Sequence, residues 1–105
     1  RDWGHSRDYV KAMWLMLQQD ELDDYVVATG ISHTVRSFCE KAFASVGLNY
    51  KDHVISKEAF FRASESVTLR GNPEKAEREL GWKATISFDQ MVTEMVEADL
   101  NDLRK

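Results

Sequence analysis

The sequence predicts an α/β domain that is mainly helical and has a few short strands. Three observations favour this fold class: several segments carry helix start and stop signals, apolar residues recur at helical spacing, and one short β-branched run ends at a glycine. Hydrophobic residues make up 43% of the 105 residues and charged residues 30%, which is typical of a folded chain rather than a disordered one.

The first helix is expected over residues 6–18. Four apolar residues at positions i, i+3, i+4 and i+7 place one apolar stripe on a helical face: Val10, Met13, Trp14 and Leu17. An acidic connector follows at residues 20–24. Residues 25–29 then form a short apolar run that is rich in β-branched side chains and stops at Gly30, which predicts a buried strand.

The second helix is expected to begin near Ser32 or Thr34, because either hydroxyl can accept a hydrogen bond from the first turn. It is expected to stop at Gly47. Its apolar face consists of Val35, Phe38, Cys39, Ala42, Phe43 and Val46. Beyond it, residues 53–56 and 67–69 are candidates for two further short strands.

Two more helices carry clear boundary signals. Asn72 can cap the third helix, Pro73 suits a first helical position, and Gly81 is a natural stop. Ser87 and Gln90 have the spacing of a capping box, in which each side chain accepts a hydrogen bond from the backbone of the other. A final amphipathic helix is therefore expected from this box to the end of the chain.

The charge balance excludes several classes of protein. The formal net charge is −4 and the isoelectric point is near 5.3, with basic residues scattered singly, which disfavours nonspecific binding to nucleic acid or anionic membranes. The sequence has no apolar run of membrane-spanning length, and its charged and polar first residues lead us to expect no signal peptide. The single cysteine, Cys39, suits a reducing cytoplasm. The first residue is Arg1 rather than methionine, so a boundary inside a longer protein is expected.

No simple catalytic constellation is present in the sequence. Cys39 lies on the apolar face of its helix and is interpreted as a buried structural thiol rather than a nucleophile. The three histidines lack metal-ligand spacing, and capping or packing explains His5 and His33 as well as ligation does. There is no glycine-rich dinucleotide turn, and no tyrosine has a lysine four residues on. We therefore assign no catalytic, cofactor-binding or metal-binding residue within the chain.

A small set of charged residues suits a phosphorylated ligand. The guanidinium of Arg1 can hold a diphosphate through two hydrogen bonds, and Asp2 can fix that guanidinium. Arg62 can supply positive charge to phosphate, and Glu65 can accept hydrogen bonds from sugar hydroxyls. Solvated surface charges are the competing explanation for each of these residues.

The sequence also resembles a known family. Residues 1–10 read RDWGHSRDYV and are similar to the RDWGHAxDYV stretch of GDP-mannose 4,6-dehydratases, which are extended short-chain dehydrogenases/reductases. The similarity continues through residues 12–18, 25–30, 33–38, 71–76, 80–83 and 94–100. It covers nearly the whole chain, with a gap around residues 48–60.

The resemblance implies that the chain is the C-terminal, substrate-binding portion of a Rossmann-type enzyme. Residues 1–30 would be the tail end of the Rossmann-like region and residues 31–105 the small substrate-binding lobe, forming one compact unit. The glycine-rich turn for NADP and the catalytic Thr, Tyr and Lys would precede Arg1. The implied reaction oxidises C4 of GDP-mannose, removes water across C5 and C6, and returns the hydride to C6.

The resemblance also implies the ligand contacts. The first arginine of the family's Arg-Asp-Trp motif corresponds to Arg1 and would contact the diphosphate of a GDP-sugar. The family's Arg-Pro-x-Glu motif corresponds to Arg62 and Glu65 and would bind the nucleotide. Ala63 replaces the proline of that motif, so the loop is expected to be less preorganised, and Asn72 replaces the usual aspartate.

Three alternatives to the dehydratase hypothesis stay open. A related keto-sugar reductase uses similar binding residues. A free-standing, non-catalytic module could retain the lobe for nucleotide binding or assembly, and it would cover its apolar surface by forming a homo-oligomer. A helical interaction domain whose family likeness is vestigial is the third.

Overall fold

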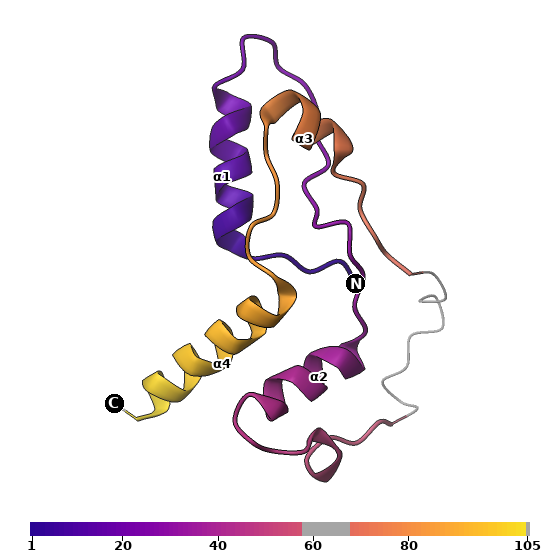
Figure 1. Cartoon of the computed structure of the whole chain (residues 1–105), viewed down its shortest axis with the longest axis vertical. Helices are drawn as coiled ribbons and strands as arrows, with labels where there is room; N and C mark the ends of the chain where they lie inside the picture. Colours follow the sequence, from indigo (N-terminus) through magenta and orange to yellow (C-terminus); the bar gives the residue numbers. More distant parts are fainter. Residues whose placement is uncertain (58–67, 105) are drawn as a thin grey trace.

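The computed structural model describes residues 1–57 and 68–104, and its regular structure there is helical. The elements in chain order are α1 (Ser6–Leu17), α2 (Val35–Ala44), the 3₁₀ turn η1 (Tyr50–Asp52), α3 (Glu74–Leu80) and α4 (Phe88–Leu103). The four predicted α-helices are therefore confirmed, with bounds close to those expected. Extended segments connect them, and Figure 1 shows how these segments cross the middle of the molecule.

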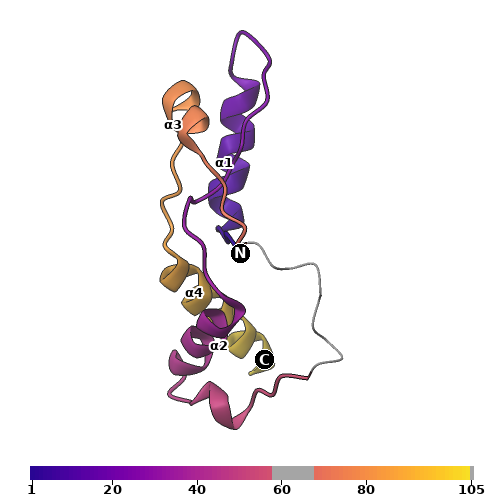
Figure 2. The ribbon, with the colours of Figure 1, turned by 90° about the vertical axis from the view of Figure 1, so that its right-hand side faces the viewer.

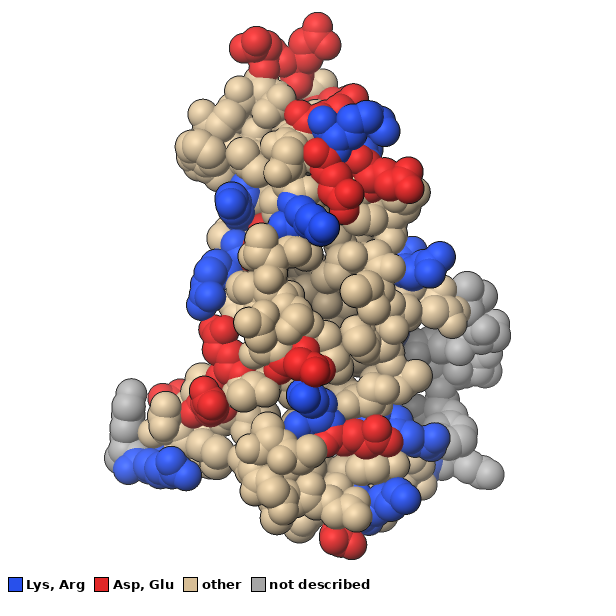
Figure 3. All heavy atoms as spheres, viewed as in Figure 1, with Lys and Arg blue, Asp and Glu red and all other residues tan. Residues whose placement is uncertain are grey.

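The helices are arranged as two pairs. α1 lies beside α3, α2 lies beside α4, and the two views of the ribbon agree on this arrangement (Figures 1 and 2). The molecule is flat, with extents of 52 × 40 × 18 Å. Acidic side chains gather at the end of the molecule where the chain leaves α1 (Figure 3). There Lys75 of α3 forms an ion pair of 2.8 Å with Asp23 of the connector.

A histidine side chain caps the first helix. Nδ1 of His5 accepts a hydrogen bond of 3.0 Å from the backbone N–H of Arg7. Because that nitrogen accepts, the proton of the neutral ring is placed on Nε2, which lies 3.2 Å from Oε1 of Glu94 on α4. The guanidinium of Arg7 also contacts Oε1 of Glu94, at 3.1 Å. The N-terminus of α1 is thus tied to the middle of α4.

The remaining helix boundaries follow the predicted local chemistry. The Thr34 hydroxyl caps α2, and Gly47 beyond its end has a φ of +77°. Asn72 accepts a hydrogen bond of 3.1 Å from the backbone of Glu74, although α3 begins one residue later than Pro73. Gly81 ends α3 in the left-handed region, at a φ of +66°, where a side chain would be strained.

The capping box at the start of α4 is confirmed. The Ser87 hydroxyl accepts from the backbone N–H of Gln90 at 3.1 Å, and the Gln90 side chain accepts from the backbone N–H of Ser87 at 3.0 Å. The backbone N–H groups of Ser87 and Gln90 are thus each bonded to the side chain of the other residue. Because the two residues are only three positions apart, this helix start could be predicted from the sequence alone.

Two small cores stabilise the two helix pairs. In the first, the buried residues Ala12, Ala76, Leu80 and Trp82 pack between α1 and α3. In the second, Met91 and Val92 of α4 are buried, and Phe88 in the first turn of the same helix belongs to an aromatic cluster. That cluster consists of Trp3, His33, Phe38 and Phe88. The packing role expected for His33 is therefore confirmed, since its ring stacks on Phe88 with centroids 3.8 Å apart.

The predicted strands are not confirmed in the residues that the structure describes, because no strand is formed there. Residues 25–29 run extended but are not hydrogen-bonded into a sheet, residues 54–57 are irregular, and so are residues 68 and 69. Val67 lies outside the described residues. A strand needs a neighbouring strand to satisfy its backbone groups, and residues 1–57 and 68–104 supply none. The strand part of the α/β prediction is thus not reproduced, and the described fold is helical.

Candidate ligand-binding site

The carboxylate of Asp2 joins three distant parts of the chain. One oxygen accepts hydrogen bonds from the backbone N–H and the hydroxyl of Thr29, at 3.0 and 2.6 Å. The other accepts from the backbone N–H groups of Gly30 and Gly71, at 2.9 and 3.1 Å. Burial opposes ionisation of Asp2, but these four hydrogen bonds outweigh burial and hold its pKa below the ordinary value.

This arrangement corrects the role expected for Asp2. Asp2 was expected to fix the Arg1 guanidinium, whereas its two oxygens accept hydrogen bonds from the Thr29 hydroxyl and from the backbone of Thr29, Gly30 and Gly71. Asp2 therefore holds residues 29 and 30 against residue 71.

Replacing Gly71 by alanine is expected to open this junction. A Cβ at position 71 would clash with the Cβ of the buried residue Ala28, so the backbone would shift away from Asp2. We expect the free energy of unfolding to fall by about 2–3 kcal/mol, the upper part of the usual cost of overpacking. Gly47→Ala is the control, because no atom lies within 4 Å of a Cβ built there. Its left-handed φ adds a strain of about 1 kcal/mol, so a Gly71→Ala cost no greater than that of Gly47→Ala would contradict the prediction.

A second carboxylate, Asp8, joins α1 to the segment before α4. It accepts hydrogen bonds from the backbone N–H groups of Thr85 and Ile86, both at 3.0 Å, and from the Thr85 hydroxyl at 2.7 Å. Burial opposes its ionisation, but these hydrogen bonds prevail and lower the pKa of Asp8. The backbone carbonyl of Asp8 also accepts from the indole N–H of Trp82, at 2.8 Å. Asp8 was not among the residues predicted from the sequence.

Arg1 is held by backbone pairing with His33. The nitrogen of Arg1 donates to the carbonyl of His33 at 2.7 Å, and the nitrogen of His33 donates to the carbonyl of Arg1 at 2.8 Å. The two residues exchange both hydrogen bonds, as an antiparallel pair does. Successive side chains of an extended segment point to opposite sides, and the segment that contains His33 accordingly borders two cavities.

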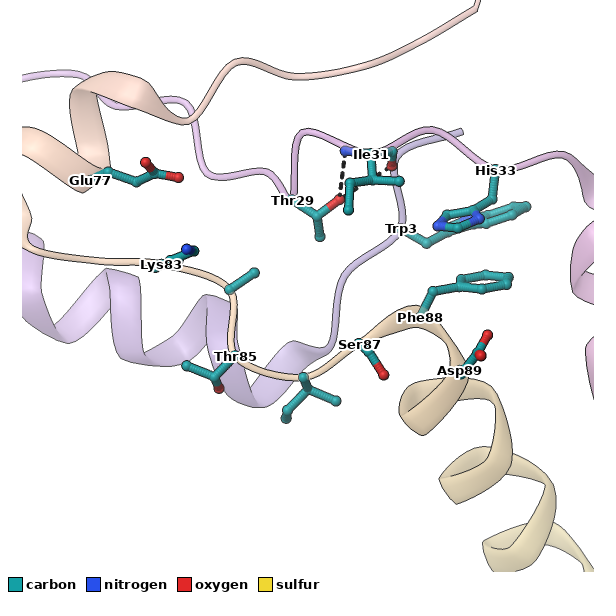
Figure 4. Close-up of a pocket in the computed structure, with 12 residues that line it drawn as sticks. Trp3, Thr29, Ile31, His33, Glu77, Lys83, Thr85, Ser87, Phe88 and Asp89 are labelled. Carbon is teal, nitrogen blue, oxygen red and sulfur yellow. Dashed lines mark hydrogen bonds between the residues drawn. The ribbon is translucent and has the colours of Figure 1, made fainter.

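The first cavity has a volume of about 420 Å³ and lies between two extended segments. Thr29, Ile31 and His33 line one side, and residues 83–87 line the other. Figure 4 shows the aromatic side chains of Trp3, His33 and Phe88 at one end and the charged groups of Glu77 and Lys83 at the other. The walls of this cavity are mainly apolar, and the charged residues that line it include both acidic and basic side chains.

The second cavity contains the first of the predicted ligand contacts. Its volume is about 490 Å³, and it is lined by Arg1, by residues 32–35, and by Thr68 and Leu69. Residues 32–35 include the N-terminal cap of α2, where backbone N–H groups and the helix dipole favour an anion. No acidic residue occupies the first turn of α2, and Arg36 lies in it. Among the residues that line this cavity, Arg1 and the N-terminal cap of α2 are the features that suit a phosphate group.

The other two predicted contacts, Arg62 and Glu65, lie outside the described residues. Thr68, which follows Glu65 by three positions in the sequence, lines the Arg1 cavity. Cys39 is half-buried, rather than fully buried as expected. Its position on α2, beside Phe38 of the aromatic cluster, still agrees with a packing role.

The described residues do not fit a dinucleotide cofactor. Such a site needs a strand, a glycine-rich turn and a helix whose N-terminus meets the pyrophosphate. Residues 1–57 and 68–104 contain no strand from which such a turn could start. We therefore assign no redox step to these residues. No helix in the described part of the chain combines the length and apolar character that a membrane crossing needs.

Comparison with known proteins defines the family. The family model described as GDP-mannose 4,6 dehydratase matches residues 1–95. The chain is 53% identical over 100 residues to GDP-mannose 4,6 dehydratase 1 of Arabidopsis thaliana, which covers 95% of this chain and 28% of that protein. It is 42% identical to the Homo sapiens GDP-mannose 4,6 dehydratase over 99% of this chain and 32% of that protein. For the Vibrio cholerae enzyme the identity is 38%, over 95% of this chain and 34% of that protein.

These matches place the chain among the dehydratases. More specifically, the chain belongs to the GDP-mannose 4,6 dehydratase family, and it spans about a third or less of the length of the relatives that it matches. The resemblance drawn from the sequence is thereby confirmed.

Proposed function

We propose that this chain is the substrate-binding segment of a lyase that converts GDP-mannose to GDP-4-keto-6-deoxymannose. Family membership supports the reaction class, and the cavity beside Arg1 supports the binding role. The chain grips the nucleotide sugar and supplies no catalytic residue. NADP is the cofactor of the whole enzyme, and the residues that bind it lie outside this segment.

The cavity beside Arg1 carries this proposal. Arg1 and the residues at the N-terminus of α2 line the same cavity, and a guanidinium and backbone N–H groups are the donors that an anion needs. A diphosphate needs this combination, since charge-assisted hydrogen bonds to phosphate are the strong ones. In the proposal, Arg62 and Glu65 complete the site. Arg62 supplies positive charge to the phosphate groups of the nucleotide, and Glu65 accepts hydrogen bonds from its sugar hydroxyls.

Three features of the larger protein belong to the same proposal. Residues 1–30 continue the Rossmann-like region of the enzyme, and residues 31–105 form its small lobe. The protein acts in the cytoplasm, where a single unpaired cysteine is stable. The chain also forms a homo-oligomer, for which the exposed apolar surface of α1 is the supporting observation.

A non-catalytic module for binding or assembly is the second candidate. The same exposed surface of α1 favours it, because a surface of that kind is suited to assembly. A keto-sugar reductase is separated from the dehydratase by cofactor and product assays on the whole enzyme.

Calorimetric titration of the chain with GDP, GDP-mannose and UDP tests the binding role. We expect selective binding of the guanosine ligands, weakened about tenfold or more by Arg62→Ala and by Arg1→Ala, because each loses charge-assisted hydrogen bonds. Arg78→Ala is the control, since Arg78 is exposed on α3 and does not line the Arg1 cavity. Absence of binding at millimolar nucleotide, or equal affinity for GDP and UDP, would contradict the proposal.

A further inference from the structure

One oxygen of the Asp2 carboxylate bridges two segments that are distant in the sequence. Its Oδ2 atom accepts hydrogen bonds from the backbone N–H groups of Gly30 and Gly71, at 2.9 and 3.1 Å. The second segment approaches the first so closely that a Cβ on Gly71 would clash with the Cβ of Ala28. A single carboxylate and close packing at a glycine therefore hold the two segments together.

The same two segments continue into the two walls of the Arg1 cavity. One wall, residues 32–35, begins two positions after the first glycine, and the other wall, residues 68 and 69, ends two positions before the second glycine. Arg1 is joined to the first wall, because it exchanges two backbone hydrogen bonds with His33. Two residues of extended chain span at most about 7 Å. The place of each wall is thus tied to the carboxylate.

We propose that Asp2 is a positioning residue for the nucleotide: its carboxylate fixes the two walls of the Arg1 cavity at the spacing that a diphosphate needs. This inference rests on the binding role proposed above for that cavity. Asp2 is not among the residues that line the cavity, so it acts through the backbone of Gly30 and Gly71 and does not touch the ligand. A preformed cavity binds more tightly, because the ligand does not have to order the walls.

The negative charge of Asp2 separates this role from an electrostatic one. A carboxylate repels a nearby phosphate group, so the removal of its charge would strengthen nucleotide binding if charge alone decided the affinity. The loss of positioning acts in the opposite direction. An asparagine side chain has nearly the same shape but one acceptor oxygen instead of two, so part of the backbone that Asp2 binds loses its acceptor. Asp2→Asn is therefore expected to weaken nucleotide binding although it removes a negative charge.

Calorimetric titration with GDP, at a temperature where circular dichroism shows every variant to be folded, tests this inference. We expect Asp2→Asn to raise the dissociation constant about tenfold, as when about a tenth of the molecules keep the binding-competent form. Gly71→Ala displaces the same junction without a change of charge and should also weaken binding. Asp8→Asn is the matched control, because it removes equivalent hydrogen bonds from Thr85 and Ile86, which line the other cavity. It should leave the affinity for GDP unchanged.

A distance measurement tests the spacing of the walls without any ligand. Val35 and Leu69 are exposed residues of the opposite walls, so cysteines placed there can carry spin labels in a chain that also has the substitution Cys39→Ser. Electron paramagnetic resonance then reports the separation of the two labels. We expect one narrow distribution of distances in the labelled parent chain and in its Asp8→Asn variant, and a broader one in Asp2→Asn.

The outcomes distinguish this inference from the proposed function. If Asp2→Asn binds GDP as tightly as the parent chain or more tightly, or if Asp8→Asn weakens binding equally, the positioning role is overturned and the binding role of the cavity stands. A parent chain that binds no GDP would overturn the binding role and, with it, the ligand named in this inference. An unchanged label distance in Asp2→Asn would overturn the positioning role whether or not GDP binds.

Discussion

Replacing Trp82 by alanine is expected to lower the free energy of unfolding by about 3–5 kcal/mol, the usual cost of deleting a buried aromatic side chain. Trp82 is 2% exposed and is one of the two largest fully buried side chains among the described residues. A chain of this size has a total stability of about 5–15 kcal/mol, so the loss is a large fraction of it. Urea denaturation followed by circular dichroism measures the effect.

A second substitution separates packing from hydrogen bonding at this position. Trp82→Phe keeps an aromatic ring in the core between α1 and α3 but removes the indole N–H that donates to the carbonyl of Asp8. We expect an intermediate loss, in which the missing hydrogen bond accounts for about 1 kcal/mol. If Trp82→Ala lowered the free energy of unfolding by less than about 1 kcal/mol, the core between α1 and α3 would contribute little to the stability of the chain.

Removing the Asp8 carboxylate is expected to cost about 2–3 kcal/mol, because the hydroxyl of Thr85 and the backbone N–H groups of Thr85 and Ile86 lose a charged acceptor in a buried place. Asp8 is 4% exposed, so water does not readily replace the acceptor. Asp8→Ala is the variant, and Asp99→Ala on the exposed face of α4 is its control, with an expected change within about 0.5 kcal/mol.

The same carboxylate gives stability a defined pH dependence. The pKa of Asp8 is lower in the folded chain than the ordinary value of about 3.9 in an unfolded one. Its stabilising contribution is therefore complete above the unfolded pKa and is lost as the pH falls through the folded pKa. Unfolding free energies measured between pH 7 and pH 2 should fall less steeply below about pH 4 in Asp8→Ala than in the parent chain. Equal slopes would contradict the assignment.

The parts of the fold that the sequence predicted depend on neighbouring residues. The capping box of Ser87 and Gln90 and the glycine stop at Gly81 involve partners within a few positions. Because such interactions depend only on residues close together in the sequence, the bounds of α3 and α4 were predicted almost correctly. Arg62 and Glu65 lie outside the described residues.

The parts that the sequence did not predict depend on distant residues. The run at 25–29 has strand composition, but composition does not supply a neighbouring strand. The stripe of α1 was recognised, yet periodicity does not reveal that Ala12 on the opposite face is the buried one. Asp8 precedes Ala12 by four positions and so shares its helical face, but the sequence does not mark that face as the buried one.

The candidate site was only partly predictable for the same reason. Arg1 was identified from its motif, and the structure places it in a cavity with the start of α2. The hydrogen-bond partners of Asp2 are 27, 28 and 69 positions away, so the residues near Asp2 in the sequence do not predict them.

The hydrogen bonds of Asp2 also have a consequence for the dynamics of the chain. The amide protons of Thr29, Gly30 and Gly71 all depend on one carboxylate, so they should exchange with deuterated solvent at similar rates, as a single opening unit. Any ligand that selects the closed form of this junction would slow all three together. The exchange rates of these three amide protons would therefore show whether such a ligand is bound.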